Sequence, residues 1–573
     1  MRSDYVVKII YMKRINSPVT FIFLVLFWFS GNTISAQNPS WVWAKSATGS
    51  EESGSIATDQ SGNSFAAGKF TGSSVTFGTH TLVNEDASGL TSDLFLVKYD
   101  ADGNVVWAKG AFTDMNMADG AASVTTDNTG NIYMTGSFSS DTIKFGNFPV
   151  KNKFYTKDDI FIVKFNPAGN ALWARSAGGT MYDYGRSIAV DGSGNVFVTG
   201  SFQWSMNIGT YLESDDHTNG SHNDVFLAKY NSDGNFMWAV NAEGSYSDIP
   251  ESVTTDDKGN VYVTGRFNSH YLTFGTHMIT NFNASGTPEF IPEDIFLVKY
   301  DGNGNCLWAK SAGGNNTEAG SSVKVDLDGS IFLTGYYKSP VFKIGNSTLT
   351  NFETAGARND LFIAKLDGSG NVIWANSSGG SGDDCAYSVA IENNNVYQAG
   401  YFSSSTITFG TVTLTLNDPS NCFIARYDKD GKASWVLTSL GDSQIKAQSI
   451  SLDAAGNAFI TGNFSGPVNF GTSGLSDNGI FVAKAVTGNL SEIIDTDKTS
   501  TIKTYPNPAK FSIGLETSDQ SEVEIYNSSG IFIKRILTNS CKTDIDLSDL
   551  PDGIYIFKII SGGKTELKKI IKG

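Results

Sequence analysis

A short phrase built on tryptophan recurs seven times along the chain, usually as Trp-Ala. The seven tryptophans are Trp43, Trp107, Trp173, Trp238, Trp308, Trp374 and Trp435. Their mean spacing of about 65 residues lies just above the periods typical of solenoids, propellers and other repeat arrays. Because a single such unit cannot bury its apolar face alone, we expect the chain to fold as an array of equivalent units.

Each repeat contains four short apolar runs, which we call A to D. In the third repeat they cover residues 187–190, 195–202, 224–230 and 235–239. The runs are rich in β-branched and aromatic residues and are bounded by Gly, Asn and Asp, so they predict strands. Tight turns containing Gly and Asn join A to B and C to D, as at residues 191–195. Two hairpins in each repeat predict a four-stranded antiparallel blade.

The number of strands predicts how the array closes. Seven A–B hairpins and seven C strands can be counted, but the last C strand runs into a linker without a D strand. The missing strand is found at residues 40–45 (Ser-Trp-Val-Trp-Ala-Lys), at the start of the mature chain. We therefore predict an all-β fold, a seven-bladed β-propeller whose ring is closed by the N-terminal strand, which leaves only short, protected sheet edges.

Two repeated positions agree with this geometry. Strand A, nearest the axis where space is short, begins with serine in every repeat: Ser55, Ser123, Ser187, Ser252, Ser322, Ser388 and Ser449. The D-strand tryptophans recur in equivalent slots flanked by apolar residues. We interpret them as packing residues that cover the blade-to-blade cores, because ligand-binding residues usually vary between blades.

The two ends of the chain differ from the repeats. Residues 1–36 read as a signal peptide, with basic residues before the apolar run at 19–29, which is too short for a comfortable membrane span. Translation from Met12 would give a shorter, more regular signal peptide. No later stretch could cross a bilayer, so we expect an exported mature protein without a transmembrane segment. The propeller is expected at 37–488, a polar linker at 489–500 and a small β-sandwich domain at 501–573.

Three motifs mark the last domain. It opens with Tyr505, Pro506, Asn507 and Pro508, continues with Leu547, Leu550, Gly553 and Tyr555, and ends with Lys568, Lys569 and Lys572. In this order the motifs resemble the C-terminal sorting domain of type IX secretion substrates in Bacteroidetes. The resemblance implies that residues 501–573 engage the type IX machinery, so that the protein is secreted or attached to the outer surface.

The repeats themselves resemble the bacterial SBBP-type β-propeller family. The matching residues are the Asp-Gly-Ser-Gly-Asn-Val-Phe-Val-Thr-Gly segment at 191–200 and Asp-x-Phe-x-x-Lys segments such as Asp294 to Lys299. The resemblance covers about 450 residues. It implies the propeller fold and carries no known activity.

Charge and cysteine content bound the function. The chain carries 41 basic against 58 acidic residues, a net charge of −17. This balance argues against nucleic acid, whose phosphates require a basic face, and against an anionic membrane surface. Four cysteines are few for an exported chain of this size. We interpret Cys306 and Cys422 as buried free thiols, with a Cys385–Cys422 disulfide as the alternative.

The connections between strands place a candidate site on one face. The A–B and C–D turns are minimal, whereas the B–C connections are long and variable, and they emerge beside the D–A loops. Binding residues concentrate on variable loops held by a rigid scaffold, so any site is expected on the B–C/D–A face.

An acidic residue recurs in these D–A loops, four positions before the repeated serine. The six residues are Glu51, Asp119, Asp183, Asp248, Glu318 and Asp384, and the seventh repeat has Ile445 instead. One interpretation is structural, since a carboxylate can accept backbone N–H groups and hold the turn into strand A. The other is an acidic collar that attracts Ca²⁺ or a cationic ligand. The near-regular repetition favours the structural interpretation.

Aromatic residues near these loops break the repeat pattern and supply the ligand-binding candidates. They are Tyr182, Tyr184, Trp204 and Tyr246, together with Asp183 and Asp248. Their rings could stack on a sugar or a peptide, or pack against neighbouring loops. His217, His222 and Asp215 offer a weaker metal cluster.

No catalytic residue can be assigned, because the chain lacks a nucleophile elbow, a His-Glu-x-x-His motif and a phosphate loop. We therefore expect a non-enzymatic binding module for polysaccharide or protein. The alternatives are an extracellular polysaccharide hydrolase or lyase that uses carboxylates of the B–C/D–A face, and a structural or adhesion protein of the surface.

Overall fold

The computed structural model describes residues 39–487 and 503–572 with short gaps. The gaps are residues 87, 114–116, 155, 215–221, 285–290, 393–394, 416–419, 442–443, 477, 506–508, 518–519, 528–531, 539, 541, 551–552 and 562–563. The predicted signal peptide and linker lie outside these residues, as do Asp215 and His217. Every regular element within them is a β-strand. No helix in this part of the chain is long and apolar enough to span a membrane.

Residues 39–487, with the gaps above, contain seven successive groups of four antiparallel neighbours, in the predicted order A to D. The A strands are β2 (Thr48–Thr58), β8 (Asp119–Thr126), β14 (Tyr184–Val190), β20 (Asp248–Thr255), β26 (Glu318–Val325), β32 (Asp384–Glu392) and β38 (Gln444–Leu452). The B strands are β3 (Ser64–Phe77), β9 (Ile132–Phe138), β15 (Val196–Phe202), β21 (Val261–Phe267), β27 (Ile331–Tyr337), β33 (Asn395–Phe402) and β39 (Ala458–Ser465).

The two outer strands of each group follow the same order. The C strands are β5 (Asp93–Tyr99), β12 (Asp159–Phe165), β18 (Asp224–Tyr230), β24 (Asp294–Tyr300), β30 (Asp360–Leu366), β36 (Asn421–Tyr427) and β42 (Gly479–Val486). The D strands are β6 (Val105–Lys109), β13 (Ala171–Gly179), β19 (Phe236–Asn241), β25 (Cys306–Gly313), β31 (Val372–Ser378), β37 (Ala433–Thr438) and β1 (Ser40–Ser46).

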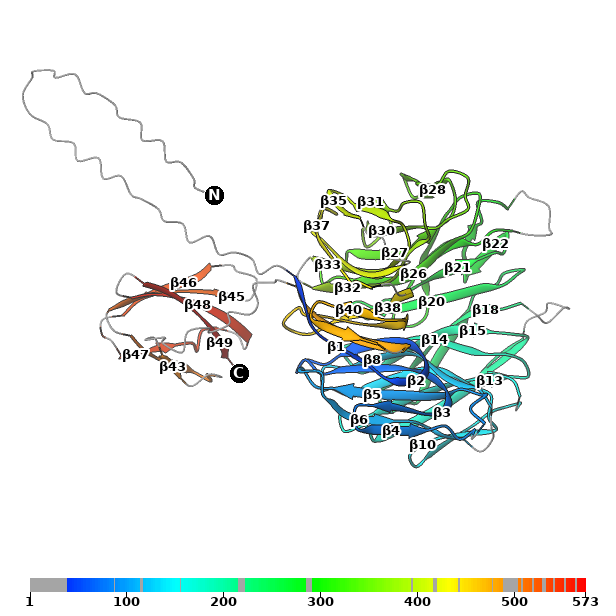
Figure 1. Ribbon diagram of the computed structural model, residues 1–573, viewed down its shortest axis with the longest axis horizontal. Helices are drawn as coiled ribbons and strands as arrows, with labels where there is room; N and C mark the ends of the chain where they lie inside the picture. Colours follow the sequence, from blue (N-terminus) through cyan, green and yellow to red (C-terminus); the bar gives the residue numbers. More distant parts are fainter. Residues whose placement is uncertain are drawn as a thin grey trace, which may run out of the picture. The chain divides into compact units, whose positions relative to one another are not determined.

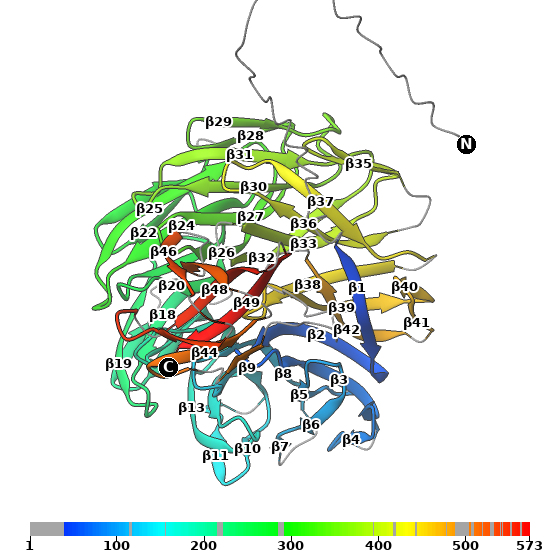
Figure 2. The same cartoon turned by 90° about the vertical axis from the view of Figure 1, so that its left-hand side faces the viewer.

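The first strand of the described chain belongs to the last group. Its sheet order is β1-β42-β39-β38, and Trp43 of β1 lies opposite Lys484 of β42. This is the pairing that the sequence predicts for the missing D strand. The blue strands β1 and β2 accordingly lie beside the orange strands β38–β42 in both views (Figures 1 and 2).

Apart from the connection between β32 and β33, the A–B and C–D turns contain an aspartate or asparagine and a glycine. The Asp191 carboxylate accepts hydrogen bonds from the backbone N–H groups of Ser193 and Asn195, both at 2.9 Å. Gly194 follows with φ of +79°, in the left-handed region that glycine enters without a steric penalty. The same pattern recurs at other turns, which explains their short, uniform length.

The D-strand tryptophans join neighbouring groups, as predicted. Trp173 is 6% exposed, packs on Tyr133 of its own sheet, and donates a hydrogen bond from Nε1 to the Ser232 carbonyl of the next C–D turn (3.1 Å). A Cβ added to Gly234 of that turn would lie only 2.6 Å from the Trp173 ring, so the turn needs a glycine. The buried clusters likewise combine residues of adjacent groups, for example Ile160 with Phe226.

The long B–C connections are not simple loops, which the sequence reading did not anticipate. Each contains a short hairpin or a hairpin extension of strand B: β4 (His80–Val83) on β3, β10 (Thr142–Phe145) with β11 (Phe148–Lys151), β16 (Ser205–Ile208) with β17 (Tyr211–Ser214), β22 (Tyr271–Phe274) with β23 (His277–Thr280), β28 (Val341–Ile344) with β29 (Ser347–Thr350), β34 (Thr406–Phe409) with β35 (Val412–Thr415), and β40 (Val468–Phe470) with β41 (Ser473–Leu475). In three of these hairpins the first strand ends in Thr-Phe and the turn begins with Gly, at residues 76–78, 273–275 and 408–410, and the phenylalanine is buried, as at Phe274.

Some of these hairpins also bond to the preceding group. Met206 of β16 pairs with Gly179 of β13, Lys343 of β28 pairs with Gly313 of β25, and β10 pairs with β7 (Phe112–Thr113). Much of the length on the B–C/D–A face therefore belongs to the scaffold and not to free loops.

The C-terminal domain consists of two sheets around one core. A three-stranded sheet contains β43 (Lys503–Tyr505), β44 (Ser512–Glu516) and β47 (Lys542–Asp546). A four-stranded sheet has the order β46 (Phe532–Leu537), β45 (Ser521–Asn527), β48 (Gly553–Ser561) and β49 (Lys564–Lys572). Leu550 and Tyr555 of the sorting motif are buried in the shared core with Ile513 and Val523. Pro506 to Pro508 lie outside the described residues.

The described cysteines are free thiols, so the alternative Cys385–Cys422 disulfide is not formed. Cys385 and Cys422 are buried, and the Cys385 thiol donates to the Tyr401 hydroxyl at 3.7 Å. Cys306 is half-buried, so it is less enclosed than the sequence suggested.

Candidate functional site

Each A strand contains a β-bulge at the same place, directly before the repeated serine. Between Gly185 and Ser187, for example, the pairing of β14 with β15 skips Arg186. The seven skipped residues are Gly54, Ala122, Arg186, Glu251, Ser321, Tyr387 and Gln448. A bulge leaves its extra residue unpaired and redirects the side chain. We refer to these seven positions as the bulge residues.

The bulge residues line two cavities. The central cavity has a volume of about 380 Å³ and is lined by all seven bulge residues and all seven repeated serines. The mouth cavity has a volume of about 710 Å³ and is also lined by all seven bulge residues. It adds residues from the A-strand starts and B-strand ends, such as Asp119, Tyr184, Arg266 and Tyr336, so it opens toward the B–C/D–A face.

The repeated serines connect neighbouring A strands. The Ser187 hydroxyl accepts a hydrogen bond from the Val253 N–H of the next A strand at 3.1 Å. The same bond recurs from Ile188, Val323, Val389 and Ile450 to Ser123, Ser252, Ser322 and Ser388, and the Ile56 N–H bonds to Ser449 of the last group at 3.2 Å. The serines therefore have a structural role around the central cavity, consistent with strand A being innermost.

Ion pairs cross the wall of the mouth cavity. The Arg266 guanidinium lies between Glu251 (Nε to Oε1, 3.4 Å) and Glu293 (Nη1 to Oε2, 3.2 Å). Burial opposes the charge on Arg266, but these two carboxylates raise its pKa. Burial raises the pKa of Glu251, and the neighbouring arginines counteract that shift. A second pair joins Lys69 to Glu52 at 2.8 Å.

Aromatic side chains form another part of the wall. The Tyr184 ring lies 5.7 Å from the Arg186 guanidinium, and burial raises the pKa of its hydroxyl to about 12. Tyr387 makes an edge contact with Tyr336 at 6.2 Å between ring centroids. It also stacks on Tyr401 at 5.9 Å. The mouth cavity therefore offers aromatic faces beside charged groups.

Of the aromatic candidates, the structure brings Tyr182 and Tyr184 together. Their rings stack at 6.3 Å, and the Lys157 ammonium donates to the Tyr182 hydroxyl at 3.0 Å. Tyr184 lines the mouth cavity, whereas Tyr182 lies outside its lining.

Trp204 and Tyr246 lie elsewhere. Trp204 is 47% exposed and has a positive φ of +67°. Tyr246 contacts the rings of His222 and His270, at 5.5 and 5.9 Å. Neither aromatic residue belongs to the lining of the mouth cavity.

The acidic residues of the D–A loops act as structural acceptors where their side chains are described. In Asp248, one carboxylate oxygen accepts from the Ser269 N–H (3.3 Å) and the other from the Ser269 hydroxyl (2.8 Å). Asp119, Asp183, Glu318 and Asp384 are likewise buried and accept backbone N–H groups. Through these bonds each carboxylate holds its D–A loop to a backbone N–H group on the B–C/D–A face. This confirms the structural interpretation for these five residues.

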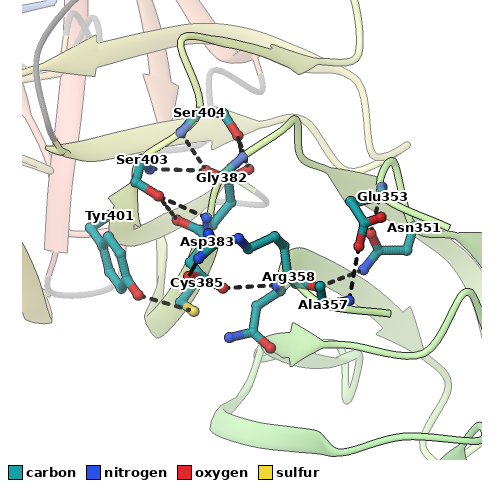
Figure 3. Close-up of polar contacts among 12 residues, drawn as sticks. Asn351, Glu353, Ala357, Arg358, Gly382, Asp383, Cys385, Tyr401, Ser403 and Ser404 are labelled. Atoms are coloured by element: carbon teal, nitrogen blue, oxygen red, sulfur yellow. Dashed lines mark hydrogen bonds and ion pairs between the residues drawn. The ribbon is translucent and has the colours of Figure 1, made fainter. Parts of the chain in front are cut away.

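The neighbouring residues reinforce this tie. In the loop before β32, the Gly382 N–H bonds to the Ser404 hydroxyl and the Asp383 N–H to the Ser403 hydroxyl, at 2.9 and 2.7 Å (Figure 3). The Arg358 guanidinium then reaches Asp383 from the B–C connection at 2.8 Å. The D–A loop and the B–C connection of one sheet are thus bound together.

The five carboxylates do not form a common cation site. Burial raises the pKa of Asp119 and Asp384 to about 7 and that of Asp183, Asp248 and Glu318 to about 8. In the part of the chain that the structure describes, no three His, Cys, Asp or Glu side chains gather closely enough to hold a metal ion. The calcium collar therefore stays a prediction; the Glu51 side chain lies outside the described residues.

Sequence reasoning missed the bulge residues, although a signal was present. When the repeats are aligned on the serine, the position before it holds Gly, Ala, Arg, Glu, Ser, Tyr or Gln. Variation in size and charge beside an unvarying serine could have marked the position. The bulge itself cannot be read from this variation. It is the bulge that allows two consecutive residues, the bulge residue and the serine after it, to line the cavities together.

Two segments of the chain match known family models. Residues 503–573 match the secretion system C-terminal sorting domain. Residues 172–201 and 243–271 match the SBBP β-propeller repeat.

Individual relatives are more distant. An uncharacterized WD repeat-containing protein of Acanthamoeba polyphaga mimivirus is 26% identical over 465 residues, which is 68% of this chain and 32% of the relative. The regulatory protein FlaEY of Caulobacter vibrioides is 25% identical over 198 residues, which is 35% of this chain and 20% of the relative. The chain thus spans a third or less of the length of these relatives. The solved polysaccharide lyase Uly1 is 9% identical, with a TM-score of 0.37 over 75% of this chain and 90% of the lyase.

The two family matches agree with the motifs and with the strand order. The sorting domain indicates export to the cell surface or the extracellular space. The chain therefore contains segments that match the SBBP β-propeller repeat, followed by a domain that matches the secretion system C-terminal sorting domain.

Proposed function

We propose that this exported protein is a non-enzymatic extracellular binding module whose ligand enters the mouth cavity of a closed, seven-bladed propeller. Pairing of β1 with β42 supports the closure. The bond from the Ile56 N–H to Ser449 and the bond from Trp43 Nε1 to the Ala101 carbonyl (3.2 Å) also support it. These two hydrogen bonds join the first and last groups in the same way as the equivalent bonds join other neighbouring groups.

The ring of bulge residues is the observation that carries the binding role. All seven face the same two cavities, and the repeat scaffold places no common residue type on them. Function commonly resides on variable positions that a rigid scaffold presents. Their variation therefore favours recognition over packing.

The chemistry of the mouth cavity favours polysaccharide over protein. No aliphatic side chain larger than alanine belongs to its described lining, which is otherwise polar, charged or tyrosine. Protein interfaces usually contain a buried cluster of large apolar and aromatic anchors. Tyrosine rings beside hydrogen-bonding groups instead suit a hydroxyl-rich ligand such as a sugar chain.

A glycan-binding screen of the mature chain, residues 37–573, tests this proposal. We expect a hit that Tyr387→Ser weakens by about tenfold, because serine occupies the same bulge position at Ser321 and should leave the fold intact. Tyr271→Ser is the matched control, since Tyr271 is exposed on β22, outside the mouth cavity. Equal binding by wild type and Tyr387→Ser, or binding to surface proteins alone, would contradict the proposal.

An extracellular polysaccharide hydrolase or lyase is the second candidate, and Glu251 is the observation that favours it. Its carboxylate lines both cavities, and burial raises its pKa, as an acid catalyst requires. Glycosidases generally use two carboxylates that flank the scissile bond. Asp119, the other buried carboxylate of the lining, is already held by the Ser139 N–H and the Ser140 hydroxyl. Shortened glycan products that vanish with Glu251→Gln would replace the binding proposal with an enzymatic one.

A further inference from the structure

The central cavity has an excess of positive charge. Its described titratable lining consists of Arg186, Glu251, Lys324 and Tyr387. Glu251 forms an ion pair with Arg266, which lies outside this lining, and its carboxylate also interacts electrostatically with Arg186. The two remaining charged groups, Arg186 and Lys324, are both cations.

Lys324 is foreign to the repeat pattern. Strand alternation places residues two apart on one face, so Lys324 shares the inward face of Ser322. The equivalent positions in the other repeats hold small residues: Ala57, Thr125, Ala189, Thr254, Ala390 and Ser451. The scaffold therefore does not need a lysine here.

The Lys324 ammonium has no hydrogen-bond or ion-pair partner among the described residues, and burial lowers its pKa. Lys324 is half-buried in the cavity wall, and an ammonium that loses water without gaining a partner destabilises a folded protein. A bound anion would remove that destabilisation.

Arg186 is the second unsatisfied cation. Its guanidinium lies over the Tyr184 ring, and its Nε is buried without a hydrogen-bond partner in the described structure. The other two basic groups of the mouth cavity, Lys69 and Arg266, are already paired with Glu52 and with Glu251 and Glu293. Arg266 also has a buried Nε without a hydrogen-bond partner, but Arg186 is the basic group of that wall for which the described residues show no ion pair at all.

The serine ring provides further donors. Six of the seven serine hydroxyls accept a backbone N–H, as described above, which orients each oxygen. Within the described residues none of the seven hydroxyls donates a hydrogen bond to another protein group, so their hydrogens remain available to a ligand in the central cavity.

We propose that the two cavities bind a carboxylate or sulfate group of an acidic polysaccharide, held by Arg186 and Lys324 with help from the serine hydroxyls. This inference rests on the proposed function and specifies its ligand. A guanidinium suits planar, bidentate recognition of oxyanions, and an ammonium supplies a second point charge. The net charge of −17 opposes such a ligand only weakly, because salt screens the surface charges that lie more than about 8 Å from the site.

Calorimetry on the mature chain tests the inference with three probes: an oligogalacturonate, a sulfated galactan oligosaccharide and a neutral galactan oligosaccharide. We expect one or both acidic probes to bind, the comparison between them to identify carboxylate or sulfate, and the neutral probe to bind weakly. Lys324→Ala and Arg186→Gln should each lower the affinity for the acidic probe by at least about tenfold. Added salt should weaken the wild type more than either variant.

Two controls separate a lost contact from a lost fold. Alanine occupies the Lys324 position in three sister repeats, so Lys324→Ala should melt at the same or a higher temperature than wild type without ligand. Lys343→Ala removes a lysine that lies over Phe282, away from both cavities, and should bind normally.

The outcomes also distinguish the inference from the proposed function. Acidic probes that bind Lys324→Ala and Arg186→Gln as well as wild type, or that bind nothing at millimolar concentration, overturn the inference. If the neutral probe binds and Tyr387→Ser weakens it while Lys324→Ala does not, the binding function stands and the anionic ligand is wrong. If no saccharide binds at all, both fail.

Discussion

Two positions of the repeat behave in opposite ways: the D-strand tryptophan and the bulge residue of strand A. The tryptophan recurs in every repeat, and its indole joins one sheet to the next, as Trp173 does with the Ser232 carbonyl. The bulge residue changes from glycine to tyrosine between repeats and faces a cavity. Under the proposed function, the regular position builds the scaffold and the variable position recognises the ligand. The four substitutions below test this contrast.

The largest effect should come from the scaffold position. Trp173→Ala removes a buried ring and its inter-sheet hydrogen bond, so we expect a loss of about 3–5 kcal/mol in stability, measured by denaturant unfolding. Leu172→Ala on the same strand is the control, because Leu172 is 43% exposed and should change stability little. A small loss of stability in Trp173→Ala would contradict the structural role that the comparison gives to the repeated tryptophan.

The buried acidic residues should make stability fall as pH rises. The pKa of Asp248 is about 8 in the folded protein, against about 4 in an unfolded chain. The folded state therefore holds the proton more tightly, and stability is lost between about pH 4 and pH 8. Melting temperatures across this range should decline less in Asp248→Asn than in wild type. Asp102→Asn, which removes a carboxyl group from an exposed turn, is the control variant measured beside it. A slope in Asp248→Asn equal to that of the wild type would refute the assignment.

A bulge residue should matter little for folding. Tyr387→Ser should change stability by about 1 kcal/mol or less, because the residue is unpaired in the sheet and serine occupies the same place in the preceding repeat. Thermal unfolding measures this beside the binding assay. A loss of stability as large as that of Trp173→Ala would show that the bulge position is needed for folding. It would then no longer differ from the tryptophan position.

The smallest effect should be at Trp204, the exposed candidate outside the mouth cavity. Its positive φ costs a side-chain-bearing residue energy, so Trp204→Gly should raise stability by about 1 kcal/mol or less. Glycan binding should remain unchanged. Weakened binding in this variant would move the site from the mouth cavity to the outer loops.

Local patterns were sufficient for much of the fold. The Asp-x-x-Gly-Asn turns, the apolar runs and the unpaired C strand before the linker predicted four-stranded groups and the pairing of β1 with β42. These features depend on neighbours in sequence or on a simple strand count. The structural role of the repeated acidic residues could also be predicted, because a carboxylate that recurs at one loop position suggests a common hydrogen bond to the backbone.

The sequence alone was enough to predict the repeat, the strand order and the export tail. Each of these depends on short motifs, whose residues interact mainly with neighbours in the sequence. The mouth and central cavities were decided only by tertiary structure. A bulge is a register shift between two strands, so no single strand reveals that Arg186 and Glu251 face inward. Lys324 and Arg186 lie 138 positions apart and line one cavity only because successive sheets bring their A strands together.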